Sequence, residues 1–584
     1  MLTRDYFLLA GFCLVLFGVS LVGGRPMTMH ESVLPQCTRE MHDRGDWLTP
    51  HSGGRPWLHR PPLPHWVILA LTSPFGRVDE PWLVRLAPMV MSTCVVLMMA
   101  WLASQWWGRG FGMLSGLALA TSFQFTRYAW LAEEDTILCA VITATLVLFA
   151  RFETVDREEN PNRTFFGWRS WSLLAFFVCF GLTNMAKGLI FGPLMAGVPM
   201  AAFMLLHFKW RRLQRYLWLW GFVAAAIAAG AWPAFIYWKH PDVLEMWIYD
   251  YAGRLYDGYI GEPWWYYFGV WTWALVPWTP VAAYGLFLTF RRALQPNALP
   301  ERFLLCWGVG TILFFSIPDG KHHHYMIHTL PPWGLITAIG VLKLRDHLAA
   351  WMATGSALWR RAAIPALVLG IPGAAAIYLL RHKVPGPDWL PWLFMAGLPA
   401  IVAVGAWAWF QPRARLAMGV GFAGLAVLFM TGHVYVGRYV DHGRDDWAFL
   451  KEVRRMQPTA TPLYVNAELR CCLEVNRVLF ALDRSAKAVH NLSFLLDERL
   501  QDEKVLVITT AGDAERLQRI GTTRVVKQSA QSRREESPAD RLTLFEVALR
   551  PDRPRYPNGV TISQQQIKHR KPGPFLGGQN PKDW

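Results

Sequence analysis

"YFLLAGFCLVLFGVSLVG", residues 6–23, is followed closely by "PMTMHESVLPQCTREMHDRGDW", residues 26–47. The first stretch is apolar and close in length to the roughly 20 residues that an α-helix needs to cross a bilayer. Because many similar segments follow it and it lacks a convincing small-residue cleavage site, we interpret it as a retained membrane helix. The second stretch is polar and has no obvious hydrophobic period, so it is predicted to be a loop outside the bilayer.

The composition of the 584-residue chain is that of a membrane protein. Hydrophobic residues make up 53% and charged residues only 17%, whereas soluble proteins average about 25% charged. The 31 Trp and 34 Phe fit aromatic belts at bilayer interfaces. The net charge is +16, and in a polytopic protein such an excess lies in cytoplasmic loops. We therefore predict the bilayer as a partner, and no nucleic acid.

About thirteen segments are long and apolar enough to be membrane spans. They lie at residues 6–23, 82–104, 111–130, 136–150, 171–186, 189–207, 217–238, 264–290, 303–317, 325–342, 363–380, 390–410 and 416–436. With the N-terminus in the cytoplasm, the loops rich in Lys and Arg fall on the cytoplasmic side, as the positive-inside rule requires. Since the number of spans is odd, the C-terminus is predicted to be extracytoplasmic.

The pattern of the chain changes after about residue 440. Short strands such as "KVLVITT" (504–510) follow amphipathic helices such as "DDWAFLKEVRRM" (445–456), which is typical of a small α/β domain. We predict an α-helical membrane domain over residues 1–440 with its first outer loop at 24–81. An extracytoplasmic α/β domain at 441–550 and a disordered tail at 551–584, rich in Pro, Gly, Gln and Lys, follow it.

Ionisable side chains from loops far apart in the sequence are predicted to lie on one side of the membrane. They are His30, Glu31, His59, Arg60, Glu133, Glu134, Asp135, Lys187, Asp250, Arg254, Asp257, Asp319, Lys321 and His322–His324, next to Tyr325. Charges at membrane depth are costly and mark functional sites. Carboxylates among several cations suggest a general base that acts beside a bound phosphate.

Simpler structural interpretations stay open for several of these residues. Asp135 could be an N-cap at the start of a helix, and the Lys187 side chain could snorkel to the interface. Glu133 and Glu134 could be solvated charges at a helix start. No cofactor is required by the pattern, but a divalent metal stays open, with His59 and His323 as its candidate ligands.

Five motifs, in their order along the chain, resemble a known family. They are "HESVLPQCTREMHDRGDWLTPHSGGRPWLHRPPLPHW" (30–66), "YAWLAEEDTIL" (128–138), "GLTNMAKGLIFGPL" (181–194), "YAGRLYDGYIGEPWWYYFGVWTWALVPW" (251–278) and "FFSIPDGKHHHYMIHTLPPWGL" (314–335). Together they resemble the polyprenyl-phosphate-sugar-dependent glycosyltransferases of family 83. This is the group of the lipid A aminoarabinose transferase, and it is related to the protein O-mannosyltransferases.

This resemblance implies a GT-C fold, which is a helical membrane bundle with an outer cavity roofed by helices of the first loop. It also implies a bacterial inner-membrane protein that transfers a hexose or pentose, with inversion, from a polyprenyl-phosphate-linked sugar donor. The acceptor would be a lipid or glycolipid at the extracytoplasmic face. The implied catalytic residues are Glu31, Asp135 and His30. Those implied to bind the donor phosphate are Arg60, Arg254, Lys321, Tyr325 and Lys187.

The chain departs from the family pattern at two positions. His30 replaces the leading, catalytic Asp, and His59 replaces the Glu of a Glu-Lys-Pro turn. Glu31 is favoured over His30 as the base, because a histidine beside a phosphate tends to be protonated.

Three other functions are considered. A protein O-mannosyltransferase-like enzyme and a catalytically inactive homologue that binds lipid phosphate both stay open. A transporter would need inverted repeats and polar groups near the bilayer midplane, and the sequence shows neither.

Overall fold

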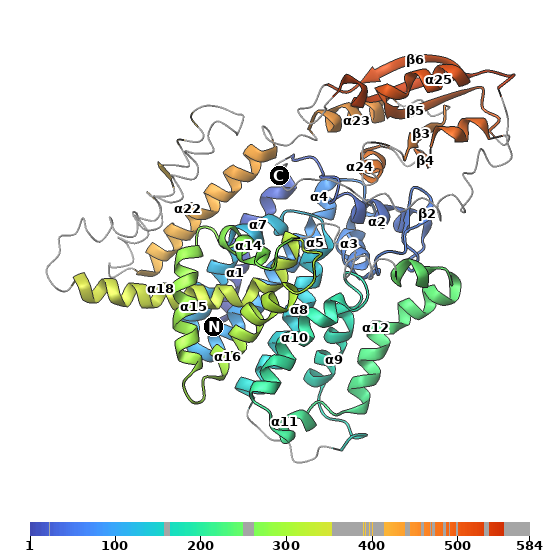
Figure 1. The fold of residues 1–584 in the computed structure, drawn as a ribbon. Coiled ribbons are helices and arrows are strands. Elements are labelled where there is room, and N and C mark those ends of the chain that lie inside the picture. Colours follow the sequence, from blue (N-terminus) through green and yellow to red (C-terminus); the bar gives the residue numbers. More distant parts are fainter. Residues whose placement is uncertain are drawn as a thin grey trace. The chain divides into compact units, whose positions relative to one another are not determined.

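The computed structural model describes residues 1–22, 24–156, 164–248, 262–352, 389, 392, 396–397, 400, 414–437, 444–456, 461–467, 469, 474–482, 486–489, 491–497, 500–530 and 537–553. The chain forms two compact units, and Figure 1 labels the elements of both. The helical unit comprises Met1–Gly23, His59–Leu71 and Arg85–Val440. The sheet unit comprises Gly24–Leu58, Thr72–Val84 and Asp441–Trp584.

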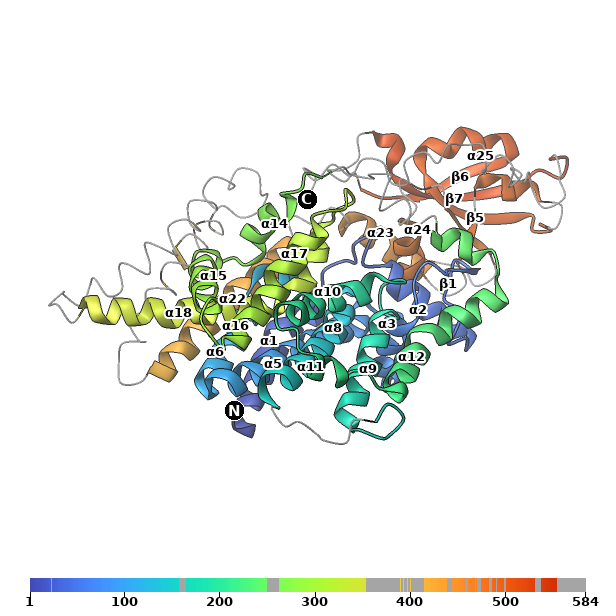
Figure 2. The same ribbon diagram turned by 60° about the horizontal axis from the view of Figure 1, so that its bottom comes forward.

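The helical unit is built around a buried helix, α8 (Glu134–Ala150), which packs against α5 (Leu86–Trp107), α9 (Trp171–Thr183) and α10 (Phe191–Leu206), as Figures 1 and 2 show. Its other helices are α1 (Thr3–Val22), α3 (Leu63–Thr72), α6 (Arg109–Ala120), α7 (Phe123–Ala129), α11 (Trp210–Gln214), α12 (Leu219–Lys239), α14 (Tyr266–Ala274), α15 (Thr279–Ala293), α16 (Leu299–Leu305), α17 (Thr311–Phe315), α18 (Pro331–Met352) and α22 (Ala414–Tyr435). Small residues let some of these helices approach closely, as is common in membranes. A Cβ added at Gly285 of α15 would lie 2.0 Å from the carbonyl oxygen of Ile336 in α18.

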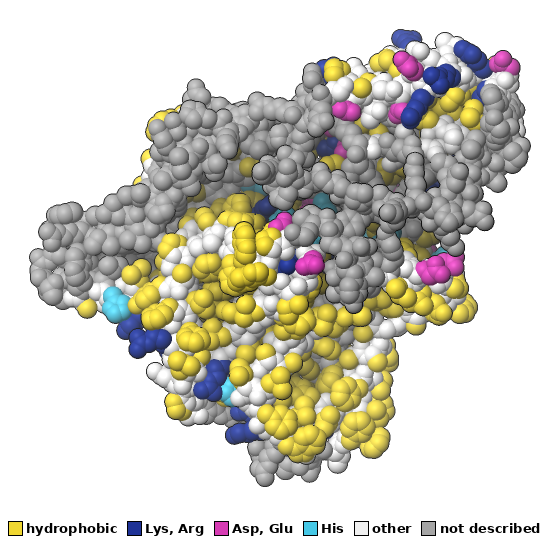
Figure 3. Space-filling model, in the orientation of Figure 1, with side chains coloured by type: hydrophobic (Ala, Val, Ile, Leu, Met, Phe, Trp, Pro, Cys, Tyr) yellow, Lys and Arg dark blue, Asp and Glu magenta, His cyan; other side chains and the backbone are white. Residues whose placement is uncertain are grey.

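The outer surface of the helical unit carries many large apolar side chains, which form a broad hydrophobic area in Figure 3. Exposed examples on α9, α10 and α12 are Trp171, Leu205, Phe222, Ile227 and Trp238. A helix that is apolar on its exposed face as well as its buried face fits a lipid environment. Among the described residues, four helices are long and apolar enough to cross a membrane, or up to six if each of two bent pairs is one span.

Several of the predicted spans are not continuous helices. The segment predicted at 264–290 consists of α14 and α15, and the chain bends by 116° at the break between them, which contains Pro277. The segment at 325–342 begins in the 3₁₀ helix η4 (His323–Thr329) and bends by 66° into α18. Proline cannot donate the helical hydrogen bond, which explains a break at each place. The prediction of continuous helices there was wrong. The predicted spans at 363–380 and 390–410 lie almost entirely outside the described residues, and the count of thirteen stays a prediction.

The sheet unit contains a mixed five-stranded sheet in the order β4-β3-β5-β7-β6. Strands β3 (Leu463–Asn466), β4 (Lys487–Val489) and β5 (Lys504–Thr510) are parallel, and β7 (Leu542–Leu549) runs antiparallel between β5 and β6 (Gly521–Gln528). Helices α23 (Arg444–Met456), α24 (Glu474–Ala481) and α25 (Ala514–Ile520) accompany the sheet (Figure 1). The predicted disordered tail at 551–584 lies outside the described residues beyond Arg553.

Two parts of the first outer loop belong to the same compact unit as this sheet, although the sequence placed the whole loop in the membrane domain. They contribute α2 (Val33–Arg44), α4 (Pro81–Val84) and a two-stranded hairpin of β1 (His51–Ser52) and β2 (Arg55–Pro56). The Arg39 side chain of α2 is buried and donates to the carbonyl oxygens of Leu479 at 2.8 Å, Leu482 at 3.2 Å and Phe480 at 3.3 Å. These carbonyls lie at the C-terminal end of α24, where a cation is favourable.

Glu40, the next residue of α2, fixes the hairpin. Its carboxylate accepts hydrogen bonds from the backbone N–H groups of Gly53 at 2.6 Å and Gly54 at 2.9 Å. Both glycines have positive φ, +62° and +84°, which a tight β1–β2 turn requires. Asp46 accepts from the N–H groups of Leu48 and Thr49, each at 3.0 Å. Through these contacts the "REM" (39–41) and "GDW" (45–47) segments hold the loop in shape.

Replacing Arg39 with alanine is expected to loosen α24, because three buried carbonyl groups lose a charged donor. We expect a loss of about 2 kcal/mol of local stability, measured by hydrogen exchange of the backbone amides of α24. Arg44→Ala on the same helix is the control, since Arg44 is exposed and makes one long bond of 3.4 Å to the Gly54 carbonyl. Equal exchange of α24 in the two variants would contradict the anchoring role of Arg39.

Candidate functional site

Asp135 lies in the first turn of α8, where the apolar helix begins, and its side chain is completely buried. The N-cap of α8 is Glu133, whose side chain makes no capping hydrogen bond. The structural interpretation of Asp135 as an N-cap is therefore wrong. A buried carboxylate needs a partner of opposite charge.

Lys187 is that partner. It lies in the turn between α9 and α10, and its Nζ donates to Asp135 Oδ1 at 2.5 Å. Only 3% of the Lys187 side chain surface is exposed, so the alternative that Lys187 snorkels to the interface is wrong. The following residue, Gly188, has φ of +95°, a conformation that only glycine adopts readily.

Two further charges extend this pair into a cluster of alternating sign. Glu134 Oε1 lies 3.9 Å from Lys187 Nζ and 3.1 Å from the Nε of Arg60, which immediately precedes α3. We call Arg60, Glu134, Lys187 and Asp135 the charge cluster. The sequence predicted that these loops converge, and within the helical unit they do. The cluster has no net formal charge, which reduces the cost of burying it.

His328 is a neighbour of the cluster that the sequence analysis missed. It lies in η4 with its side chain fully buried, and its Nε2 is 3.3 Å from Asp135 Oδ1. In the sequence, the run His322–His324 is more conspicuous than His328, because it consists of three histidines in succession. The signal that could have found His328 is its position inside a predicted span, where an ionisable residue is by default a functional candidate.

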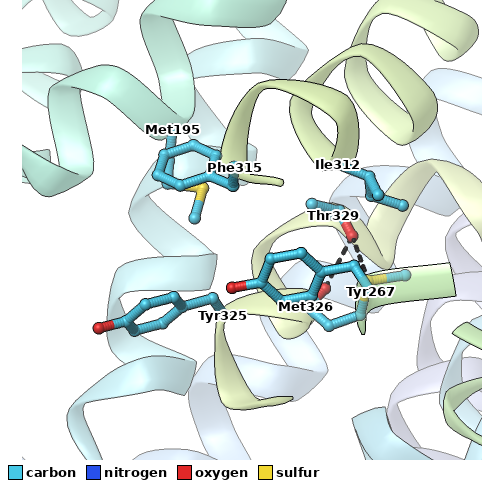
Figure 4. A pocket seen from close by; sticks show the side chains of 7 residues that line it. All are labelled: Met195, Tyr267, Ile312, Phe315, Tyr325, Met326 and Thr329. Atoms are coloured by element: carbon cyan, nitrogen blue, oxygen red, sulfur yellow. Dashed lines mark hydrogen bonds between the residues drawn. The ribbon is translucent and has the colours of Figure 1, made fainter. Parts of the chain in front are cut away.

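Tyr325 also lies in η4, and its ring centroid is 5.4 Å from Lys187 Nζ, within range of a cation–π contact. It lines a recess with about 170 Å³ of empty volume, which Figure 4 shows from close by. The other lining residues are Met195, Tyr267, Ile312, Phe315, Met326 and Thr329. The hydroxyl groups of Tyr325 and Tyr267 point to the same side in Figure 4, and the surface of the recess itself is apolar.

The other predicted phosphate and metal ligands that the structure describes have contacts of their own. The Lys321 side chain is buried and its Nζ donates to the carbonyl of Glu262 at 2.9 Å. The carbonyl of His323 accepts from Gln124 Nε2 at 2.6 Å. Arg254 lies outside the described residues. Within the described part of the chain, no group of three or more His, Cys, Asp or Glu side chains could hold a metal ion.

Glu31 and His30 belong to the sheet unit and are described within it. The N–H of Thr28 donates to Glu31 Oε2 at 3.3 Å, and the N–H of Glu31 donates to Thr28 Oγ1 at 3.0 Å. This reciprocal pattern is that of a capping box. Glu31 is completely buried, whereas His30 is exposed. The carboxylate is therefore fixed in place by its own backbone, while the imidazole next to it is accessible.

Comparison with known structures decides the fold. The crystal structure of ArnT from Cupriavidus metallidurans bound to undecaprenyl phosphate superposes with a TM-score of 0.73 at 16% identity, over 93% of this chain and 98% of that one. The same protein in the apo state gives a TM-score of 0.70. The chain has the GT-C glycosyltransferase fold.

Sequence comparisons agree with this GT-C assignment and confirm the resemblance to aminoarabinose transferases. The family model for dolichyl-phosphate-mannose-protein mannosyltransferase matches residues 36–249. Undecaprenyl phosphate-alpha-4-amino-4-deoxy-L-arabinose arabinosyl transferase from Aeromonas salmonicida is 26% identical over 324 residues, 54% of this chain and 56% of that protein. The Pseudomonas paraeruginosa protein of the same name is 25% identical, over 66% of this chain and 67% of its own length. This chain thus spans little more than half of the Aeromonas relative.

Loss of one charge of the Asp135–Lys187 ion pair is expected to destabilise this GT-C bundle, whereas loss of both charges should cost much less. Lys187→Met leaves the Asp135 carboxylate buried without its cation, which should cost about 3 kcal/mol. The double variant Asp135→Asn with Lys187→Met removes both charges and should recover most of that loss. Thermal unfolding in detergent, followed by tryptophan fluorescence, measures both effects.

The control for this experiment is the exposed pair of Arg345 and Asp346 in α18, whose side chains lie 2.7 Å apart. Because exposed ion pairs contribute little, Arg345→Met should leave the unfolding temperature unchanged. A double variant as unstable as Lys187→Met alone would contradict the view that the two charges compensate each other.

Proposed function

We propose that this chain is a membrane glycosyltransferase that moves a sugar from a polyprenyl-phosphate donor to a lipid or glycolipid acceptor at the extracytoplasmic face. The observation that carries the proposal is the buried charge cluster at the start of α8, in a chain with the fold of a protein crystallised with undecaprenyl phosphate. Relatives named as undecaprenyl phosphate-aminoarabinose transferases support the same donor class.

The donor phosphate needs positive charge as it leaves the sugar. We assign this role to Arg60, Lys321 and Arg254, with the Tyr325 hydroxyl as a further donor. Charge-assisted hydrogen bonds are the strong kind, and they stabilise the charge that develops in the transition state. Lys187 contacts Asp135 directly and lies over the Tyr325 ring, so it would add its charge to the phosphate site from that position.

The acceptor must lose a proton when its oxygen or nitrogen bonds to the anomeric carbon. We assign Glu31 as the base. His30 is the alternative, because an imidazole with a pKa near 6.5 is a competent base near neutral pH. The new bond forms on the face opposite the phosphate, and the bond from the anomeric carbon to the phosphate oxygen breaks with its electron pair leaving on the phosphate. Asp135 would orient the acceptor or the sugar.

This function requires a definite placement in the membrane. We propose a bacterial inner-membrane protein with about thirteen spans, a cytoplasmic N-terminus and an extracytoplasmic α/β domain at residues 441–550. The distribution of Lys and Arg between the predicted loops supports this orientation. The apolar outer surface of the helical unit supports insertion in lipid.

Two alternatives each have an observation in their favour. The match of residues 36–249 to the mannosyltransferase family model favours a protein acceptor. His30 in place of the family's catalytic Asp favours an inactive homologue that retains lipid-phosphate binding. Neither observation outweighs the similarity to the aminoarabinose transferases over most of the chain.

A transfer assay on the purified protein with a polyprenyl-phosphate-linked sugar tests the proposal. Glu31→Gln, His30→Ala and Asp135→Asn should each lower turnover, by about 100-fold where a proton-transfer group is lost. Glutamine at position 31 can still accept the Thr28 N–H bond, so the capping box survives. Asp43→Asn, at an exposed position of the same loop, should retain full turnover. Unchanged turnover in all three site variants would contradict the proposed site.

The class of acceptor is tested in a deletion strain of the source organism. Mass spectrometry of its lipids should show the loss of a sugar from a lipid or glycolipid, with the glycoproteins unchanged. Loss of sugar from glycoproteins alone would favour the protein acceptor. Retained binding of undecaprenyl phosphate without any transfer would identify an inactive homologue.

A further inference from the structure

The imidazole of His328 is buried without a hydrogen bond of good geometry to any residue that the structure describes. Both Nδ1 and Nε2 are in this state, although Nε2 is only 3.3 Å from Asp135 Oδ1. The second carboxylate oxygen, Asp135 Oδ2, is likewise buried and has no hydrogen-bond partner among the described residues. Polar atoms of this kind are few in folded proteins and call for an explanation.

The position of His328 is fixed by its backbone. The Trp307 Nε1 group donates to the His328 carbonyl at 3.2 Å, and Cys139 Sγ donates to the carbonyl of Ile327 at 3.5 Å. The Phe191 ring lies 5.9 Å from the imidazole, at a steep angle. A histidine held this firmly inside an apolar bundle costs free energy, so its placement against Asp135 indicates a role.

We propose that His328 is a positioning residue for Asp135. Its Nε2 and the Lys187 ammonium both face Oδ1, which directs the other oxygen, Oδ2, toward a hydrogen-bond donor of the substrate. A hydroxyl or amine group of the acceptor or of the transferred sugar is that donor. The inference rests on the proposed function and adds to it a residue that nothing in the family motifs assigns.

A neutral imidazole suits this role. Lys187 already balances the charge of Asp135, and a neutral His328 with its proton on Nε2 supplies a donor without adding a second positive charge. The carboxylate then has two contacts on Oδ1 and none on Oδ2 from the described residues. Two contacts on one oxygen keep the other oxygen oriented for a substrate without reorganisation.

Substitutions at position 328 separate the two ring nitrogens. The amide nitrogen of glutamine can reach the position of Nε2, whereas that of asparagine reaches only as far as Nδ1. We expect His328→Gln to stay within about tenfold of the wild-type kcat, while His328→Asn and His328→Leu lower kcat about 100-fold. KM for the polyprenyl-phosphate sugar should change little, because the phosphate ligands are untouched.

Thermal unfolding in detergent shows whether each variant is folded. If the leucine variant does not fold, the glutamine and asparagine variants decide, since both are polar and similar in size to histidine. Equal kcat in the glutamine and asparagine variants, whether high or low, overturns the positioning role and leaves the proposed function standing. Absence of transfer by the wild-type protein overturns the proposed function itself, and this inference with it.

Discussion

The helical unit depends on one constraint, which is that a carboxylate buried among apolar helices must be compensated. Asp135 is completely buried at the start of α8. Lys187, in the turn between α9 and α10, compensates this charge, which requires its Nζ to lie within hydrogen-bond distance of the Asp135 carboxylate. The same requirement extends outward through Glu134 to Arg60 before α3. Segments distant in the sequence are thereby brought together by the need for charge compensation as well as by packing.

The sequence predicted which loops converge, but not how their side chains pair. Asp135, Lys187 and Arg60 were all expected at one site because topology alone brings their loops to the same side. The pairing of Lys187 with Asp135 depends on the left-handed turn at Gly188 and on rotamers that no periodicity encodes. His328 was missed for a different reason: it forms no motif with its neighbours, and its position inside a predicted span was the one signal that it carried.

The fold was likewise predicted only in part from the sequence. Apolar length predicted the long helices such as α1 and α12, because a bilayer sets that length directly. It failed at 264–290 and 325–342, where prolines interrupt segments whose hydropathy is continuous. In the sheet unit, the contact of Arg39 with carbonyl groups some 440 residues further along the chain was not predicted, because nothing local in the sequence encodes it.

His30 and His328 differ in their surroundings, and this difference bears on their roles. His30 is exposed, so its imidazole can exchange protons with solvent. His328 is sealed among Phe191, Trp307 and the charge cluster, so a proton taken up there has no direct route to water. A buried histidine of this kind is suited to hold a neighbouring group in one orientation, and not to turn over protons. The difference in burial therefore supports the proposed positioning role of His328.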